Sequence, residues 1–179
     1  MLKLYIDCDG TILNTVTPLI EAAIMSGVDL NNRSEAKRFL SRYDWGTLLK
    51  KAEVINDGIN SINRIIKSGL YMPFILTHVN SYKEARLKVE YFHKYIPNIK
   101  IYAVSTDIPK ADYIPFVRGK ILVDDYKVNL QSWHEKGGLA IKFDMNNKPN
   151  NDIIVINNLD YFLANYEEVK SKVKTLIKK

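Results

Sequence analysis

The stretch Leu2-Lys3-Leu4-Tyr5-Ile6-Asp7-Cys8-Asp9-Gly10-Thr11 decides the predicted fold, because an apolar strand runs directly into two carboxylates. Ligands bind beyond the carboxyl ends of the strands in open α/β sheets. Strand side chains alternate, so Asp7 and Asp9 can point to one side while Cys8 fills the core behind them. Gly10 permits a sharp turn after the acids. We expect a site for a metal or a small anion here, although an ordinary Asp-Gly turn would leave the same pattern.

An apolar strand that ends in a reactive side chain occurs twice more along the chain. Phe74-Ile75-Leu76 ends in Thr77, and Ile121-Leu122-Val123 ends in Asp124-Asp125, with Lys110 between these two strands. In this order, the motif at residues 7–11, Thr77, Lys110 and the late acid pair resemble the four motifs of the haloacid dehalogenase superfamily. The resemblance covers about residues 1–145.

A narrower resemblance lies around the fourth motif. The stretch 121–125, followed by Asn129, Trp133 and Gly137-Gly138, is similar to the small 5′(3′)-deoxyribonucleotidase branch of the superfamily. In the superfamily, the strands that carry motifs one, two and four are adjacent. The resemblance therefore implies that Asp7, Thr77 and Asp124 meet at one edge of the sheet.

The order of predicted strands and helices favours an α/β fold. Strands are expected at 2–6, 71–77, 99–104, 120–124, 139–143 and 153–156, with helical segments between them, which indicates a mostly parallel, three-layer, Rossmann-like sheet. Residues 1–14 and 56–179 are predicted to form this core. Residues 15–55 are predicted to form a small helical cap inserted after the first strand, with Thr17-Pro18 at the start of its first helix.

Local signals place two further features of the core. Gly69 is expected to end a helix over 57–67, and Ser81 with Glu84 has the spacing of a capping box at the start of the next helix. Thr77 would then lie in the loop between strand and helix, where free backbone N–H groups bind phosphate.

The resemblance implies the chemistry of a Mg²⁺-dependent phosphatase. The metal would be held by the carboxylates of Asp7 and Asp124 and by the backbone carbonyl of Asp9, with Asp125 beside them. Asp7 would attack phosphorus and form an aspartyl-phosphate, and Asp9 would protonate the leaving oxygen and later activate water.

Phosphate binding is expected from Gly10 and Thr11, from the hydroxyl of Thr77 and from the ammonium group of a lysine. We favour Lys110 for this lysine, because it opens a segment after the third strand. Lys120 is the competing choice, since it is nearer in sequence to the late acid pair.

The predicted cap contains residues that could recognise a nucleobase. Aromatic faces and a guanidinium group suit stacking and hydrogen bonding to a base, and the candidates are Phe39, Arg42, Tyr43 and Trp45. Trp45 is in phase with Leu48 and Ala52, so packing inside a helical cap is the alternative for it.

Composition fits one enzyme domain. The chain has 179 residues, of which 46% are hydrophobic and 26% charged, and it contains a single cysteine. Its net charge is +6, but much of the excess lies in lysines near the C-terminus, where a solvated helix face explains them, so nucleic-acid binding is not expected. No signal peptide pattern or membrane-length apolar run is visible, so a cytoplasmic location is expected.

These observations predict a phosphoric monoester hydrolase that acts on a small phosphorylated substrate, with nucleoside 5′-monophosphates favoured. Another small phosphorylated metabolite or a nucleic-acid end is an alternative substrate. A binding module that keeps the fold without activity is the alternative from a different class. The sequence gives no indication of the oligomeric state.

Overall fold

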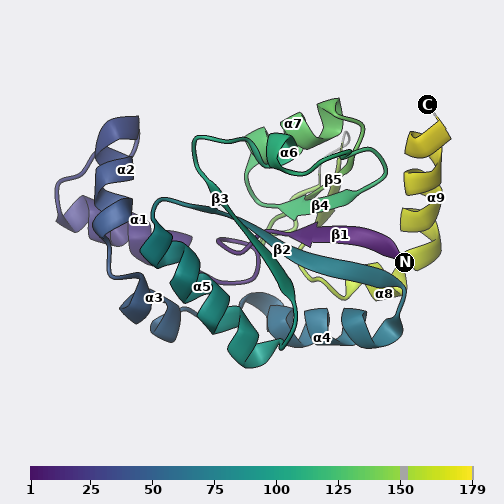
Figure 1. Ribbon diagram of the computed structural model, residues 1–179, viewed down its shortest axis with the longest axis horizontal. Coiled ribbons are helices and arrows are strands. Elements are labelled where there is room, and N and C mark those ends of the chain that lie inside the picture. Colours follow the sequence, from purple (N-terminus) through teal and green to yellow (C-terminus); the bar gives the residue numbers. More distant parts are fainter. Residues whose placement is uncertain (150–152, 179) are drawn as a thin grey trace.

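The computed structural model describes residues 1–149 and 153–178. Its strands form one parallel sheet in the order β3-β2-β1-β4-β5-β6, which confirms the predicted α/β fold (Figure 1). The strands are β1 (Leu2–Ile6), β2 (Tyr71–Val79), β3 (Lys100–Ser105), β4 (Ile121–Asp124), β5 (Leu139–Phe143) and β6 (Ile154–Ile156). The strand that carries the first two acids thus lies between β2 and β4.

Helices cover both faces of the sheet (Figure 1). One face packs against α4 (Gly58–Ser68), α5 (Tyr82–Tyr95), α8 (Tyr161–Ala164) and α9 (Tyr166–Lys178), and the other against α6 (Lys110–Tyr113) and α7 (Lys127–Glu135). Side-chain alternation in β1 divides the two cores: Leu4 and Ile6 join the first core, and Tyr5 joins the second. Tyr5 stacks on Phe74, with ring centroids 4.9 Å apart.

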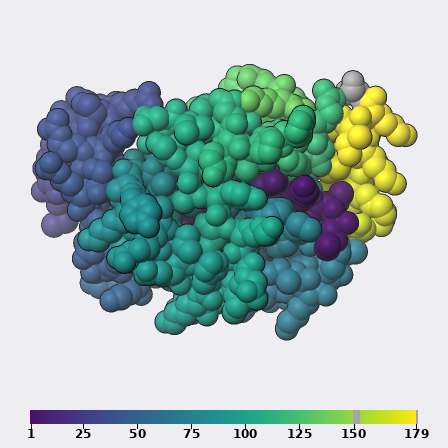
Figure 2. Space-filling view, viewed as in Figure 1, coloured from purple at the N-terminus to yellow at the C-terminus, as the bar shows by residue number. Residues whose placement is uncertain are grey.

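Three short helices follow the first strand and lie beyond the carboxyl ends of the strands, where they form a lobe at one end of the molecule (Figures 1 and 2). They are α1 (Val16–Met25), α2 (Arg33–Arg42) and α3 (Trp45–Lys51), and the turn η1 (Ile55–Asp57) leads back to α4. Trp45 and Leu48 of α3 pack with Leu87 of α5, so the lobe rests on a core helix. We call this lobe the cap, and its domain boundaries at residues 15 and 55 stay a prediction.

Two predicted boundaries around the site are wrong. The first cap helix begins at Val16 with Thr15 as its N-cap, instead of at Thr17-Pro18, and the Thr15 hydroxyl leaves the helix end to bond Asp9. The second strand continues to Val79 because it stays paired with β3 through Ser105. Thr77 therefore lies inside β2 and not in the loop after it.

The capping box is half present. The Ser81 hydroxyl accepts a hydrogen bond from the Glu84 backbone N–H at 3.1 Å, as predicted. The Glu84 carboxylate does not return to the Ser81 backbone; it accepts from the Asn80 N–H at 2.8 Å. Gly69 ends α4 in a left-handed conformation, which confirms the predicted stop signal.

Candidate active site

Three carboxylates meet where β1 and β4 end. Ile6 is paired with Val123, so the residues that follow in each strand, Asp7 and Asp124, come side by side. Each of Asp7, Asp124 and Asp125 offers an oxygen, and these oxygens all lie within 4.8 Å of one another. Such a group of hard oxygen donors is the chemistry that Mg²⁺ prefers, so the residues fit the predicted metal.

Lys110 provides the positive charge at this cluster. Its ammonium nitrogen lies 2.7 Å from Oδ1 of Asp7 and 2.7 Å from Oδ2 of Asp124, and its side chain is buried. Asn129 of α7 adds a donor, with Nδ2 at 3.0 Å from Oδ2 of Asp124. The competing lysine, Lys120, directly precedes β4 and donates to the carbonyl of Pro115. The structure thus brings Lys110, and not Lys120, to the acids.

One ammonium group does not neutralise three clustered acids. Burial raises the pKa of Asp7 well above its ordinary value, and although Lys110 lowers it, Asp124, Asp9 and Asp125 raise it further. Burial, followed by the charge of Asp124, raises the pKa of Asp125 to about 6. A cation of higher charge would relieve this repulsion and favour the ionised forms of Asp7 and Asp125.

The carboxylate of Asp9 faces a different set of groups. The hydroxyl of Thr15 donates to Oδ1 at 2.7 Å, and Oδ2 accepts from the Thr77 hydroxyl at 3.1 Å and from the Lys88 ammonium at 2.5 Å. Burial alone would raise the pKa of Asp9, but the charge of Lys88 and these hydrogen bonds lower it. The side chain of Asp9 is therefore not one of the three clustered carboxylates.

Gly10 and Thr11 occupy a tight turn behind the acids. Gly10 has a φ of +73°, and a Cβ atom there would lie 2.8 Å from Cγ of Asp125, so glycine permits the acid to pack on the backbone. Thr11 is fully buried, and its hydroxyl has no hydrogen-bond partner among the described residues. Their predicted contact with phosphate stays a prediction.

Lys88 is a buried charged residue that the sequence prediction missed. It lies on α5 with its side chain fully buried, 2.8 Å from Oε1 of Glu84 as well as 2.5 Å from Oδ2 of Asp9. A signal was present, because position 88 falls on the apolar stripe of this helix, three residues after Ala85 and four before Phe92. A lysine on a core-facing stripe needs a carboxylate partner, and Asp9 and Glu84 supply it.

The four predicted specificity residues divide into two groups. Phe39, Arg42 and Tyr43 line a hollow of about 570 Å³ in the cap, and none of the acids at the carboxyl edge of the sheet lines it. Trp45 is buried, with its indole N–H donating to the carbonyl of Leu40 at 2.9 Å. Packing is thus the observed environment of Trp45, whereas the other three side chains border an open surface.

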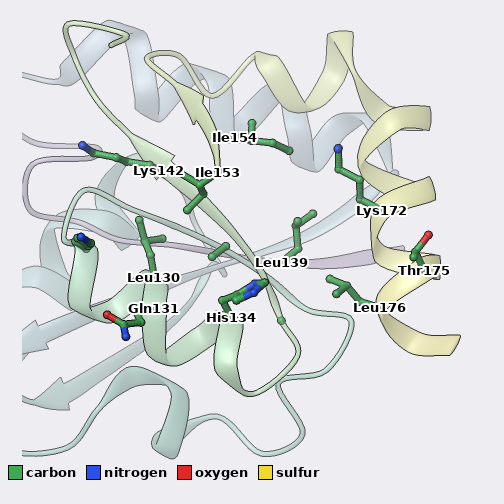
Figure 3. Close-up of a pocket in the computed structure, with 13 residues that line it drawn as sticks. Leu130, Gln131, His134, Leu139, Lys142, Ile153, Ile154, Lys172, Thr175 and Leu176 are labelled. Carbon is green, nitrogen blue, oxygen red and sulfur yellow. The ribbon is translucent and has the colours of Figure 1, made fainter. Parts of the chain in front are cut away.

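A second hollow, of about 660 Å³, lies between α7, β5, β6 and α9, away from all predicted site residues (Figure 3). Apolar side chains such as Leu139 and Ile154 share its lining with Lys142 and Lys172. Within residues 1–149 and 153–178, no helix combines the length and the apolarity that a membrane crossing requires.

Similarity to known proteins is found among solved structures. No family model matches this sequence, and no curated protein matches it. Among solved structures, a HAD hydrolase of family IA, variant 3, from Entamoeba histolytica is similar, with 17% identity, a TM-score of 0.64 and coverage of 97% of this chain and 100% of that chain.

Two further solved structures match over most of their length. A haloacid dehalogenase-like hydrolase from Streptococcus pneumoniae has 17% identity and a TM-score of 0.63, covering 93% of this chain and 98% of that one. A HAD phosphatase from Thermococcus onnurineus has 17% identity and a TM-score of 0.59, with the same coverage of 93% and 98%. The chain therefore has the fold of the haloacid dehalogenase-like hydrolases, with a cluster of acids at the carboxyl edge of its sheet.

Proposed function

We propose that this protein is a Mg²⁺-dependent phosphatase that forms an aspartyl-phosphate on Asp7 and prefers nucleoside 5′-monophosphates. The observation that carries the proposal is the arrangement of Asp7, Asp124, Asp125 and Lys110, in which one buried ammonium group contacts two of three clustered acids. A site with this excess of carboxylates is suited to a divalent cation and to a substrate that arrives with it. A cytoplasmic location stays a prediction.

The residues divide the reaction between them. Asp7 and Asp124, with the backbone carbonyl of Asp9, would hold Mg²⁺, which when bound supplies charge neutralisation for the phosphate dianion. A carboxylate oxygen of Asp7 attacks phosphorus, and the bond from phosphorus to the leaving oxygen breaks. Lys110 offsets the charge on the transferring oxygens, and the hydroxyl of Thr77, which donates to Asp9 in the structure, turns to donate to one of them.

Asp9 serves in both halves of the reaction. Its lowered pKa favours the ionised form, the state that takes a proton from water as the water oxygen attacks the aspartyl-phosphate. An approaching phosphate dianion raises the pKa of a nearby carboxyl group, which helps Asp9 to carry the proton that it gives to the leaving oxygen. After both steps, Asp7 is free and inorganic phosphate is released.

The preference for nucleotides rests on the cap. The hollow near Phe39, Arg42 and Tyr43 combines aromatic rings with a guanidinium group, and its volume of about 570 Å³ is in the range of small-molecule sites. These groups can stack on a base and donate hydrogen bonds to it. This part of the proposal is independent of the phosphate chemistry, which the acids alone would perform.

A substrate screen tests the proposal. Purified protein with Mg²⁺ is incubated with 4-nitrophenyl phosphate, glycerol phosphate and a set of nucleoside 5′-monophosphates, and phosphate release is measured. We expect hydrolysis that chelation abolishes reversibly and that Asp7→Asn removes while the circular dichroism spectrum is unchanged. Hydrolysis that survives both changes would contradict the mechanism, and an active enzyme without preference for nucleotides would contradict the substrate class.

A further inference from the structure

Lys88 connects the candidate acid Asp9 to groups on α5, β2 and α3. Besides Asp9 and Glu84, its ammonium nitrogen lies 3.1 Å from the Thr77 hydroxyl and 3.1 Å from the carbonyl of His78. The ring of Trp45 covers it, with the ring centroid 4.7 Å away. A fully buried lysine is rare and needs such partners, because an uncompensated ammonium group is unstable away from water. The partners of this lysine lie at the reacting edge of the sheet.

The carboxylate of Asp9 is restrained at both of its oxygens. Thr15 holds Oδ1, and Lys88 with Thr77 holds Oδ2. A carboxylate held at one oxygen can rotate about its last bond, since that torsion has a broad energy minimum. Holding both oxygens fixes the plane of the group and the direction of its lone pairs.

We propose that Lys88, together with Thr15, is a positioning residue that fixes the orientation of the Asp9 carboxylate for proton transfer. This inference rests on the proposed phosphatase function. Lys88 touches neither Asp7 nor the other clustered acids in its ion pairs, so it acts through Asp9. Thr15 is the N-cap of α1 and Trp45 begins α3, so two of the groups around this contact belong to the cap. The orientation of Asp9 thus depends on the cap being seated on α5.

A double-mutant cycle distinguishes positioning from general support of the fold. Lys88→Met is introduced into the wild-type enzyme and into Asp9→Asn, and steady-state kinetics are measured with 4-nitrophenyl phosphate and Mg²⁺. In the presence of Asp9, we expect kcat to fall about tenfold or more with little change in KM, because misplaced catalytic groups lose rate more than binding. In Asp9→Asn, the same substitution should change kcat by less than about twofold, since residues that act as a unit are not additive.

Two further variants keep the test decisive. Lys94→Met removes an exposed lysine from the same helix and should leave kcat unchanged in both backgrounds. Thr15→Val keeps the side-chain shape and removes only the hydroxyl. It should lower kcat by about threefold or more when Asp9 is present, and should have little effect in Asp9→Asn. If circular dichroism shows that Lys88→Met is unfolded, Thr15→Val alone tests the positioning role.

The failures are distinguishable. Asp7-dependent hydrolysis in which Lys88→Met and Thr15→Val cause equal losses in both backgrounds would overturn the positioning role and leave the phosphatase proposal standing. Absence of any Asp7-dependent hydrolysis in the wild-type protein would overturn the proposed function and this inference together.

Discussion

At the scale of single residues, two buried lysines form ion pairs with acids at the carboxyl edge of the sheet. Lys110 lies between Asp7 and Asp124, and Lys88 lies between Asp9 and Glu84. With Asp125 added, five acids share two ammonium groups, so the site retains an excess of negative charge when all of them ionise. Each lysine therefore controls the charge of a different half of the site, and a divalent cation would remove the remainder on the Asp7 side.

The two candidate catalytic lysines can be compared directly. We expect Lys110→Met to lower kcat for 4-nitrophenyl phosphate by about 100-fold or more, because an electrostatic donor to the transferring oxygens is lost. Lys120→Met removes a lysine whose ammonium group donates to the carbonyl of Pro115, away from the acids, and kcat should stay within about twofold of wild type. Thermal melts of both variants check that the protein is folded. A larger loss in Lys120→Met than in Lys110→Met would reverse the assignment.

The proposed role of Asp9 depends on the leaving group. Aryl oxygens leave with little protonation and alkyl oxygens need a proton, so Asp9→Asn should harm hydrolysis of a nucleoside monophosphate more than formation of the phosphoenzyme from 4-nitrophenyl phosphate. Single-turnover release of nitrophenol measures the second quantity, and phosphate release measures the first. Equal losses in the two assays would argue that Asp9 is not the proton donor.

At the scale of elements, the apolar runs predicted the parallel sheet correctly, because polar residues follow each run and mark where the strand stops. Glycine and serine signals also placed the end of α4 and the start of α5. The errors came from long-range contacts. Pairing with β3 extends β2 past Thr77. The Thr15 hydroxyl donates to Asp9 and therefore does not cap the start of α1. Lys88 was missed because helical lysines are usually solvated, and its partner Asp9 lies 79 residues away in the sequence.

The junction of α7 and β5 depends on a glycine that the sequence marked. A Cβ atom on Gly138 would overlap Nε1 of Trp133 and lie 2.7 Å from Cγ1 of Val117. Trp133 is a buried ring whose N–H donates to the carbonyl of Lys120 at 3.1 Å, so the ring has little freedom to give way. Overpacking of this kind costs about 1–3 kcal/mol, so Gly138→Ala should lower the free energy of unfolding by at least this amount.

A matched glycine supplies the control for that measurement. In α3, a Cβ atom on Gly46 would have its nearest neighbour, Oδ1 of Asp44, at 3.4 Å, so Gly46→Ala should stabilise the protein by roughly 0.5–1 kcal/mol. Urea denaturation followed by tryptophan fluorescence gives both values. Equal stability of Gly138→Ala and wild type would mean that Trp133 has room to move and does not hold this junction.

At the scale of the whole molecule, the cap and the core meet at two kinds of contact. Trp45 and Leu48 pack on α5 through apolar surface. On the other side, Arg33 and Lys37 of α2 pair with Asp107, which follows β3, in an exposed position. Exposed ion pairs contribute about 0–1 kcal/mol each, so the apolar contact and the buried Lys88 are the firmer attachment. The α2 side of the cap, which is held by these ion pairs, is therefore better able to move when a substrate enters than the α3 side.

Substrate selection by the cap is expected to depend on Phe39 and not on Trp45. A base stacked on a side chain is worth about 1–3 kcal/mol, so Phe39→Ala should raise KM for a nucleoside 5′-monophosphate about tenfold or more. KM for glycerol phosphate should not change, because that substrate has no base. Trp45→Ala should instead lower kcat on both substrates alike, since the buried ring covers Lys88 and supports the cap.

The pair of variants decides whether the hollow in the cap is on the substrate path. The three clustered acids do not line this hollow, so a nucleotide must extend from Asp7 into the cap for its base to contact Phe39. A KM effect confined to nucleotides would require that extended pose. Parallel changes on nucleotide and glycerol phosphate in Phe39→Ala would mean that the ring only holds the cap together, and the phosphate chemistry at Asp7 would then act without reading a base.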